Sequence, residues 1–233
     1  MSTIEQHDLA RQRLFLENGD CLERDEFLRR WDNTPDLKHA ELIDGVVYTN
    51  AASRVEEHGI PSNWIHGWLW TYTAATPGVS SASETTVELN AANIVQPDGC
   101  LYLRPECGGA TRVNRQGLLA GPPELVVEIA ASSASRDLNQ KKAAYEQAGV
   151  KEYVVWNVSA RELKWFQLES DRFTEQSSGD DGVYRSRQFP GLWLSSRHLL
   201  TGDMSGFRDV LLDGLSQPDH KEFVARLGYS PDK

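Results

Sequence analysis

The chain has 233 residues, of which 39% are apolar and 25% charged, the composition of an ordinary globular protein. It contains no run of eighteen apolar residues and no apolar signal core at its N-terminus, so we expect no membrane-spanning helix and a cytoplasmic protein. Three cysteines without a C-x-x-C pair argue against a disulfide framework and a structural zinc site. The formal net charge of −10 opposes binding to phosphates, so any contact with DNA needs a local basic surface or metal ions at an acidic site.

The first third of the chain predicts short elements. Residues 1–20 are polar and poorly periodic, which is typical of a loosely structured arm. A short helix is expected over 21–31, followed by a hairpin over 41–48, where Asp44-Gly45 suits a two-residue turn. A helix is then expected from Pro61, at the spacing of five apolar side chains: Trp64, Ile65, Trp68, Leu69 and Tyr72. We assign this stripe to core packing, with a dimer contact as the alternative.

The middle of the chain predicts strands separated by loops. Pro77-Gly78 and the serines of 80–83 indicate a loop. Strands are expected over 85–89, 94–95 and 100–103, and the stretch 105–121, rich in Gly and Arg, predicts a surface loop.

The second half gives the most strongly predicted strand, 125–130, and after it a helix over about 135–148 that ends at Gly149. Further strands are expected over 153–158 and 183–189. After Leu200 the pattern becomes helical and polar, which predicts a C-terminal helical tail.

Glu128 stands within the apolar run of 125–130. Burying an isolated carboxylate is costly unless a cation, a metal ion or hydrogen-bond donors meet it. Two interpretations of the strand stay open: a buried acid of a functional site, or an edge strand whose glutamate reaches solvent.

Lys141 falls on the apolar face of the predicted helix together with Leu138, Tyr145 and Ala148. The helix alone favours an ordinary role, in which the lysine extends its stem along the core to reach water. Pairing with Asp137 at i,i+4 would also explain the position.

Three other polar residues are candidates with ordinary alternatives. Pro97-Asp98-Gly99 is a turn signature, and the functional alternative makes Asp98 a metal ligand at a strand end. Glu41 has the position of a solvated carboxylate at the end of a strand. His58 could be a ligand or a base, but a histidine that opens a helix is more often a surface or capping residue.

The order of these residues is more specific than any one of them. A leading Glu, a Pro-Asp, a strand-borne Glu and a helical Lys together resemble the PD-(D/E)xK nuclease constellation. Over about residues 25–200 the chain is similar to the Uma-type restriction endonuclease family. The resemblance rests on Glu41-Leu-Ile-Asp-Gly45, Pro97-Asp98, Gly121-Pro-Pro-Glu-Leu-Val-Val-Glu-Ile129, Ser132-Ser133, Asp137-Leu-Asn-Gln-Lys141, Tyr145, Ala148-Gly-Val-Lys-Glu-Tyr-Val154 and Pro190-Gly-Leu192.

Two positions depart from the expected pattern. Ala130 stands where the general nuclease motif has its lysine, so Lys141 must reach the site from the helix, as in the Uma-type pattern. Gly99 follows Asp98 where that family usually continues with an apolar residue.

The resemblance implies an α/β fold with a restriction-endonuclease-like core, a mixed β-sheet flanked by helices, over residues 21–200. The arm of 1–20 and the helical extension of 201–233 lie outside it. It further implies that Asp98 and Glu128 bind Mg²⁺, with Mn²⁺ as a substitute, through hard carboxylate oxygens. Glu41 would support this shell, and Lys141 would stand beside the attacking water.

Two functional hypotheses follow. The first is a metal-dependent endonuclease that hydrolyses phosphodiester bonds of DNA, expected as a homodimer because cutting both strands suits a two-fold enzyme. The second is a catalytically silent binding or interaction module of the same fold, in which the acids serve structure.

Overall fold

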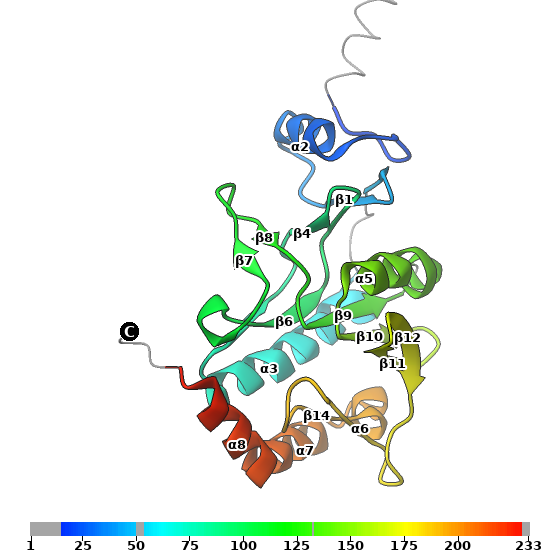
Figure 1. The fold of residues 1–233 in the computed structure, drawn as a ribbon. Coiled ribbons are helices and arrows are strands. Elements are labelled where there is room, and N and C mark those ends of the chain that lie inside the picture. The colour runs from blue at the N-terminus through cyan, green and yellow to red at the C-terminus, as the bar shows by residue number, and fades with distance from the viewer. Residues whose placement is uncertain (1–14, 50–53, 132, 230–233) are drawn as a thin grey trace, which may run out of the picture.

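The computed structural model describes residues 15–49, 54–131 and 133–229. This part of the chain forms two six-stranded sheets and a two-stranded ribbon, with helices around them (Figure 1). Sheet A contains β1 (Ala40–Ile43), β2 (Val46–Thr49), β4 (Val87–Asn90), β5 (Asn93–Val95), β7 (Arg112–Val113) and β8 (Leu119–Ala120). Sheet B contains β3 (Val79–Ala82), β6 (Gly99–Leu103), β9 (Leu125–Ala130), β10 (Glu152–Asn157), β11 (Glu162–Glu169) and β12 (Arg172–Gln176). The ribbon pairs β13 (Val183–Arg185) with β14 (Trp193–Ser195).

Both large sheets are mixed. Sheet A has the order β2-β1-β5-β4-β8-β7, and sheet B has the order β12-β11-β10-β9-β6-β3. The pairs β4–β8 and β9–β10 are parallel, whereas their other neighbours are antiparallel. The predicted α/β fold with mixed sheets and flanking helices is therefore confirmed.

The described helices and helical turns fall into five groups along the chain. They are α2 (Arg24–Asp32); the π-turn η1 (Val55–Gly59) with α3 (Ile60–Ala75); the 3₁₀ turn η2 (Pro105–Cys107); α4 (Ala134–Arg136), the π-turn η3 (Asp137–Lys141) and α5 (Lys142–Ala148); and α6 (Ser196–Thr201), α7 (Met204–Ser216) and α8 (Pro218–Leu227). No described helix is long and apolar enough to span a bilayer.

The N-terminal part of the described chain, with α2, β1 and β2, contains the predicted hairpin. β1 and β2 pair through a two-residue turn in which Asp44 and Gly45 both have positive φ, as this turn requires. The preceding helix begins at Arg24 rather than at Cys21, because Cys21 forms a bridge with Val46 of β2.

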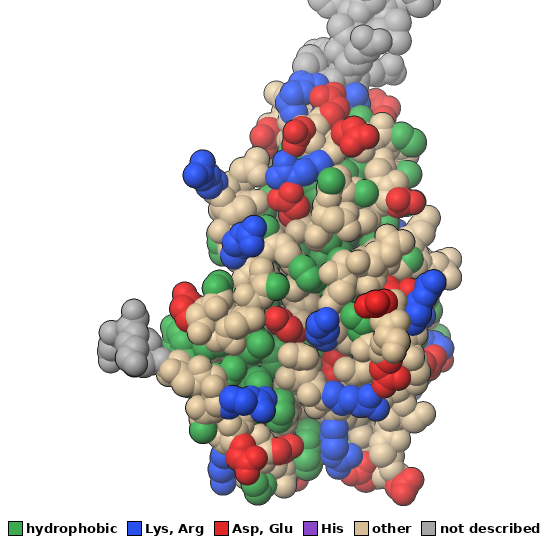
Figure 2. Space-filling model, in the orientation of Figure 1, with side chains coloured by type: hydrophobic (Ala, Val, Ile, Leu, Met, Phe, Trp, Pro, Cys, Tyr) green, Lys and Arg blue, Asp and Glu red, His purple; other side chains and the backbone are tan. Residues whose placement is uncertain are grey.

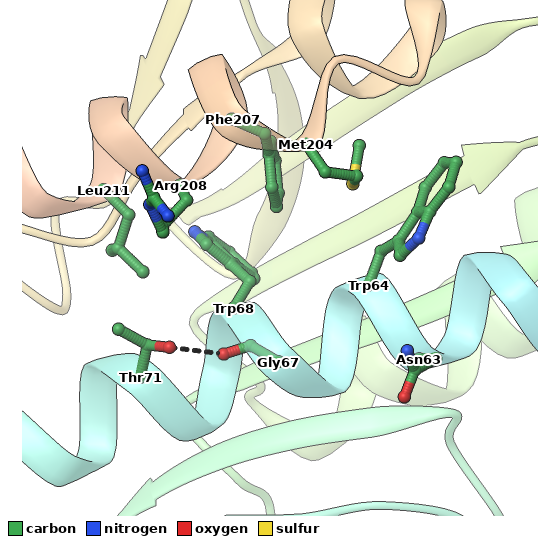
Figure 3. A pocket seen from close by; sticks show the side chains of 9 residues that line it. All are labelled: Asn63, Trp64, Gly67, Trp68, Thr71, Met204, Phe207, Arg208 and Leu211. Atoms are coloured by element: carbon green, nitrogen blue, oxygen red, sulfur yellow. Dashed lines mark hydrogen bonds between the residues drawn. The ribbon is translucent and has the colours of Figure 1, made fainter.

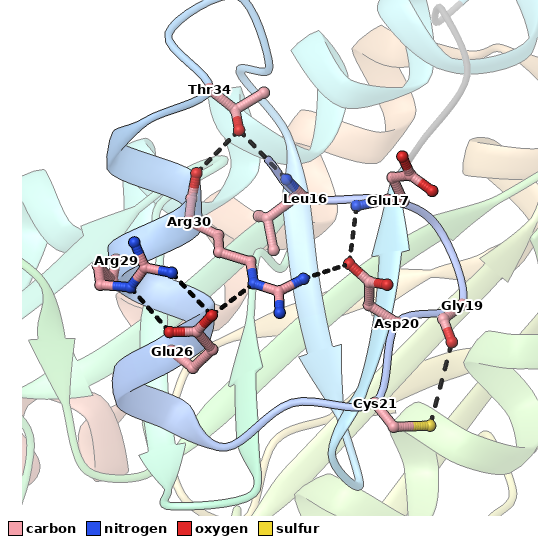
Figure 4. A network of polar contacts seen from close by, with 9 residues as sticks. All are labelled: Leu16, Glu17, Gly19, Asp20, Cys21, Glu26, Arg29, Arg30 and Thr34. Atoms are coloured by element: carbon pink, nitrogen blue, oxygen red, sulfur yellow. Dashed lines mark hydrogen bonds and ion pairs between the residues drawn. The ribbon is translucent and has the colours of Figure 1, made fainter. Parts of the chain in front are cut away.

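Residues 15–20, which belong to the predicted polar arm, pack against α2 in this part of the chain (Figure 4). Arg30 donates to Glu26 at 2.7 Å and to Asp20 at 3.2 Å, while Leu16 is buried in the cluster around Phe27. Residues 1–14 of the arm lie outside the described residues.

The loop predicted over 77–83 is wrong in part. Pro77-Gly78 does form the turn, but Val79–Ala82 is the edge strand β3, paired antiparallel with β6. Its serines are only half buried, and at a sheet edge the pairing with a neighbour outweighs weak intrinsic preference for strand. The predicted surface loop of 105–121 contains η2 and the β7–β8 hairpin, and the strand predicted over 183–189 already ends at Arg185.

The helix predicted over 61–72 is observed as α3, with Pro61 in its first turn. Ile65, Trp68, Leu69 and Tyr72 are buried in the main core, which confirms core packing for this stripe.

The C-terminal helices complete this core. Phe207 and Leu211 of α7 and Phe223 of α8 are buried in the same cluster as α3 and sheet B. Between α3 and α7 a pocket of about 320 Å³ remains, lined by apolar side chains such as Trp64 and Met204 (Figure 3). The predicted helical tail is thus helical, and it is packed on the domain.

Candidate active site

Three charged side chains from distant segments meet between the two sheets. The ammonium of Lys141 lies 2.9 Å from Glu41 Oε1 and 2.6 Å from Glu128 Oε1. Each of the three residues is at most 3% exposed. The interpretation of Lys141 as a lysine reaching water, and of Glu41 as a solvated carboxylate, is therefore wrong.

β9 presents Glu128 from the interior of sheet B. The strand lies between β10 and β6, and all six of its residues are buried. The edge-strand interpretation is therefore wrong as well. The Tyr145 hydroxyl donates to Glu128 Oε1 at 2.6 Å, so this oxygen is held by both a lysine and a tyrosine from one helical segment.

β1 presents Glu41 from sheet A. Its Oε1 accepts a hydrogen bond from the Gln96 backbone N at 2.8 Å, and Gln96 Oε1 accepts one from the Ala40 N at 3.0 Å. This reciprocal pair joins β1 to the chain that leaves β5, and fixes the carboxylate of Glu41 on the lysine.

The π-turn η3 sets the direction of Lys141. The predicted pairing of Lys141 with Asp137 does not form as an ion pair between these described residues: Asp137 Oδ2 instead accepts from the Ser133 hydroxyl at 2.6 Å. A π-turn has a wider repeat than an α-helix, so residues four apart are no longer stacked on one face. Lys141 is thereby turned toward the carboxylates of the two sheets.

Charge and burial shift the pKa values of this cluster in opposite ways. Burial raises the pKa of Glu128 well above its usual value, and Lys141 opposes that shift. For Lys141, burial alone would lower the pKa, but the attraction of Glu128, Glu41 and Asp137 outweighs it and raises the pKa. The lysine therefore stays protonated at neutral pH.

Asp98 lies in a bend where the chain passes from β5 of sheet A to β6 of sheet B. Its Oδ2 accepts a 2.6 Å hydrogen bond from the backbone N of Ile129, the residue after Glu128. The predicted turn is thus a crossing between sheets that brings Asp98 beside β9. A Cβ at Gly99 would come within 2.7 Å of Leu69 Cδ1 on α3, so a larger residue there would require the Leu69 side chain to shift.

The model of the Uma2 family, described as "Putative restriction endonuclease", matches residues 24–197. The chain belongs to the Uma2 family. Among solved structures, it is similar to "a putative nuclease belonging to DUF820" from Anabaena variabilis, with a TM-score of 0.57 and 12% sequence identity. That likeness covers 77% of this chain and 98% of the other, and at this identity it shows the fold alone. No curated protein matches the chain.

Two histidines of the Uma2 chain hold Asp98 from the side of α3. His58 Nε2 lies 3.3 Å from Asp98 Oδ1, and His66 Nε2 lies 2.7 Å from the Asp98 carbonyl oxygen. The hydrogen bond to Asp98 raises the pKa of His58, against the effect of burial. The sequence left His58 open as a ligand or base but favoured a surface or capping role, because it opens a helix. The structure places it half-buried in the π-turn η1, which leaves no pattern in the sequence.

The donor chemistry fits a hard divalent cation that keeps several of its own waters. Among the described residues, no three His, Cys, Asp or Glu side chains are grouped as ligands of one ion. Mg²⁺, however, is commonly bound by one or two carboxylates and retained waters, and Asp98, in the bend just before β6, lies beside β9, which carries Glu128. The second oxygen of Glu128 accepts no hydrogen bond from the described residues. The metal-binding roles of Asp98 and Glu128 stay predictions.

Proposed function

We propose that this Uma2 protein is a divalent-metal-dependent endonuclease that hydrolyses phosphodiester bonds of DNA. The observation that carries the proposal is the buried Lys141, held between Glu41 and Glu128 with Asp98 bonded to the adjacent residue of β9. Burying three charges costs folding free energy, and a protein in which such a buried cluster is replaced by hydrophobic residues is often as stable or more stable. The cluster is therefore not explained by stability alone, which favours a functional role. Family membership and the nuclease-like fold support the same reaction class.

Each residue has a distinct role in this proposal. Asp98 and Glu128 would hold the cation, and Glu41 would keep the lysine between the two sheets. When bound, Mg²⁺ or Mn²⁺ would polarise the scissile phosphate and lower the pKa of water. Because the pKa of Lys141 is raised, its ammonium would orient the attacking water and stabilise charge on the phosphate rather than accept a proton.

Metal binding is tested first, by thermal melting with Mn²⁺ or Ca²⁺ against EDTA. A cation at about 100 times its Kd stabilises a protein by about 2.7 kcal/mol, which is a rise in Tm of about 5–10 °C for a domain of this size. We expect this rise in the wild type and its loss in Glu128→Gln, each measured against the same protein in EDTA.

Glu124→Gln is the matched control for this variant. Glu124 is also a buried glutamate whose pKa burial raises, but it lies just before β9, at the end of the strand away from Glu128. It should keep the full metal-dependent rise. Equal responses of the two variants would contradict metal binding at Glu128.

Cleavage is tested on supercoiled plasmid DNA with Mg²⁺, with Mn²⁺ and with EDTA. We expect nicked and linear products with either metal and none with EDTA or with Glu128→Gln. A wild type that gains neither stability nor activity with metal would instead support the catalytically silent module. A homodimer, which would suit cutting of both strands, is tested by light scattering with and without DNA.

A further inference from the structure

The acidity of this chain limits where DNA can make contact. Its net charge is −10, whereas DNA affinity depends on neutralising phosphates with Lys and Arg. Many of the described cations are already paired with acids, as Arg30 is with Glu26 and Arg187 with Glu169. Cations that form no ion pair are therefore the ones to consider.

The β7–β8 hairpin carries two such cations. Arg112 lies on β7 and Arg115 in the turn of 114–117, both are exposed, and neither forms an ion pair with a described residue. β7 is the outer strand of sheet A, so the hairpin projects from the body of the molecule (Figure 1). Figure 2 shows Lys and Arg side chains projecting on the side where Figure 1 places this hairpin.

The hairpin turn is held in shape without using these arginines. Asn114 Oδ1 accepts hydrogen bonds from the backbone N of Gln116 at 2.9 Å and of Leu118 at 3.0 Å, and Gly117 has φ +81°. The two guanidinium groups are thus free for a ligand on a preformed support.

A groove of about 470 Å³ lies between the hairpin and β4. Three arginines line it, Arg24, Arg112 and Arg115, against one acid, Glu88. Glu88 is bound by the Arg24 guanidinium and by Asn114 Nδ2, so its charge is compensated within the groove wall. The groove therefore presents a net positive surface on an acidic protein.

The hairpin belongs to the sheet that carries Glu41. From β1 to β7 there are four neighbouring-strand steps in sheet A, each about 4.8 Å, or about 19 Å in all. A single nucleotide cannot span that distance, whereas one turn of duplex DNA covers about 34–36 Å. A ligand in contact with both places must be a polymer.

We propose that the β7–β8 hairpin, through Arg112 and Arg115, binds the phosphate backbone of duplex DNA that extends from the candidate active site. This inference rests on the proposed function for the position of the DNA. The contact adds affinity and carries no sequence information, because arginines on phosphates position a duplex without reading its bases.

The test is DNA binding by the full chain in EDTA, with a fluorescein-labelled duplex of about three helical turns and anisotropy as the readout. In about 50 mM salt we expect Arg112→Ala/Arg115→Ala to weaken binding about tenfold or more. The slope of log K against log salt should fall by about 1–2, because each lost phosphate contact removes about 0.9. The charge reversal Arg112→Glu/Arg115→Glu should weaken binding further, and all variants should keep the wild-type Tm because both side chains are exposed.

Arg197→Ala/Lys221→Ala is the matched control, since it removes two exposed cations from α6 and α8, at the other end of the molecule in Figure 1. It should keep the wild-type Kd and slope. The inference is overturned if the hairpin variant binds like the wild type, or if the control loses as much affinity as the hairpin variant. A wild type that binds DNA through the hairpin but never cleaves it would overturn the proposed endonuclease activity alone.

Discussion

At the scale of single residues, one ammonium compensates two carboxylates in the interior. Lys141 contacts Glu41 and Glu128 at hydrogen-bond distance, and Tyr145 donates to the same oxygen of Glu128. The free-energy cost of removing these charges from water is offset only while every partner of the cluster stays in place. The cluster is therefore a sensitive point of the fold as well as the candidate site.

Replacing Lys141 with Met tests this dependence. The variant leaves two buried carboxylates without their cation, so we expect the free energy of unfolding at neutral pH to fall by about 3–5 kcal/mol in urea titrations. The triple variant Glu41→Gln/Glu128→Gln/Lys141→Met removes all three charges and should recover most of this loss, although it should be inactive. If Lys141→Met alone were as stable as the wild type, the ion pairing of Lys141 with Glu41 and Glu128 would be contradicted.

Glu152 offers a test by pH away from the candidate site. It is fully buried on β10, and burial raises its pKa, although Ser186 and two backbone N–H groups donate to it. The native state thus holds this proton more tightly than the unfolded chain does. Between the unfolded pKa near 4.5 and the raised native pKa, the wild type should lose stability as pH rises, by at most about 1.4 kcal/mol per pH unit from this group.

Glu152→Gln keeps the shape of the side chain and cannot titrate. Subtracting its unfolding free energies from those of the wild type, measured by urea titration from about pH 4.5 upward, isolates the contribution of Glu152. We expect the difference to fall with pH across that window and to be flat above it. A difference that rises with pH would show that the native pKa is lowered.

At the scale of elements, sequence patterns predicted the strand and helix that carry the site, but not their geometry. The apolar run around Glu128 predicted β9 at its observed bounds, and Asp44-Gly45 predicted the turn between β1 and β2. The meeting of Glu41 with Lys141 joins two sheets, and only the family resemblance indicated it, since no local period reports contacts between segments 100 residues apart.

The predictions that the structure contradicts concern features that depend on tertiary contacts. The π-turns η1 and η3, which direct His58 and Lys141, depend on packing around an extra residue and leave no distinct spacing in the sequence. The serine-rich strand β3 has little intrinsic preference for its conformation and forms because β6 offers it an edge.

The close approach of α7 to the ribbon gives a prediction at this scale. A Cβ on Gly214 would come within 2.4 Å of the Gly191 carbonyl oxygen and 2.7 Å of the Trp193 ring. Gly214→Ala must therefore move α7, and we expect it to lower the free energy of unfolding by about 1–3 kcal/mol. Gly67→Ala on α3 is the control, because its Cβ meets nothing within 4 Å. It should stabilise the helix by about 0.5–1 kcal/mol, and a similar loss in both variants would point to a general helix effect.

At the scale of the whole molecule, the family match and the core do not end at the same residue. The Uma2 match stops at residue 197, whereas the main core also includes Phe207, Leu211 and Phe223 from α7 and α8. These side chains cover α3 and the ribbon, so the C-terminal helices stabilise the helix from which His66 reaches Asp98, and which follows directly on the π-turn of His58.

Two truncated chains separate the contributions of α7 and α8 to the stability of the core. A chain that ends at Gly202 loses three large buried side chains, each of which contributes about 2–5 kcal/mol, against a total stability of about 5–15 kcal/mol for a typical domain. We expect it to lack a cooperative melting transition by circular dichroism. A chain that ends at Ser216 keeps Phe207 and Leu211 and loses Phe223, so it should fold with a lower Tm and retain its response to Mn²⁺. If the shorter chain melted cooperatively at the wild-type temperature, α7 and α8 would be dispensable for the core, and the family boundary would also be the boundary of the folding unit.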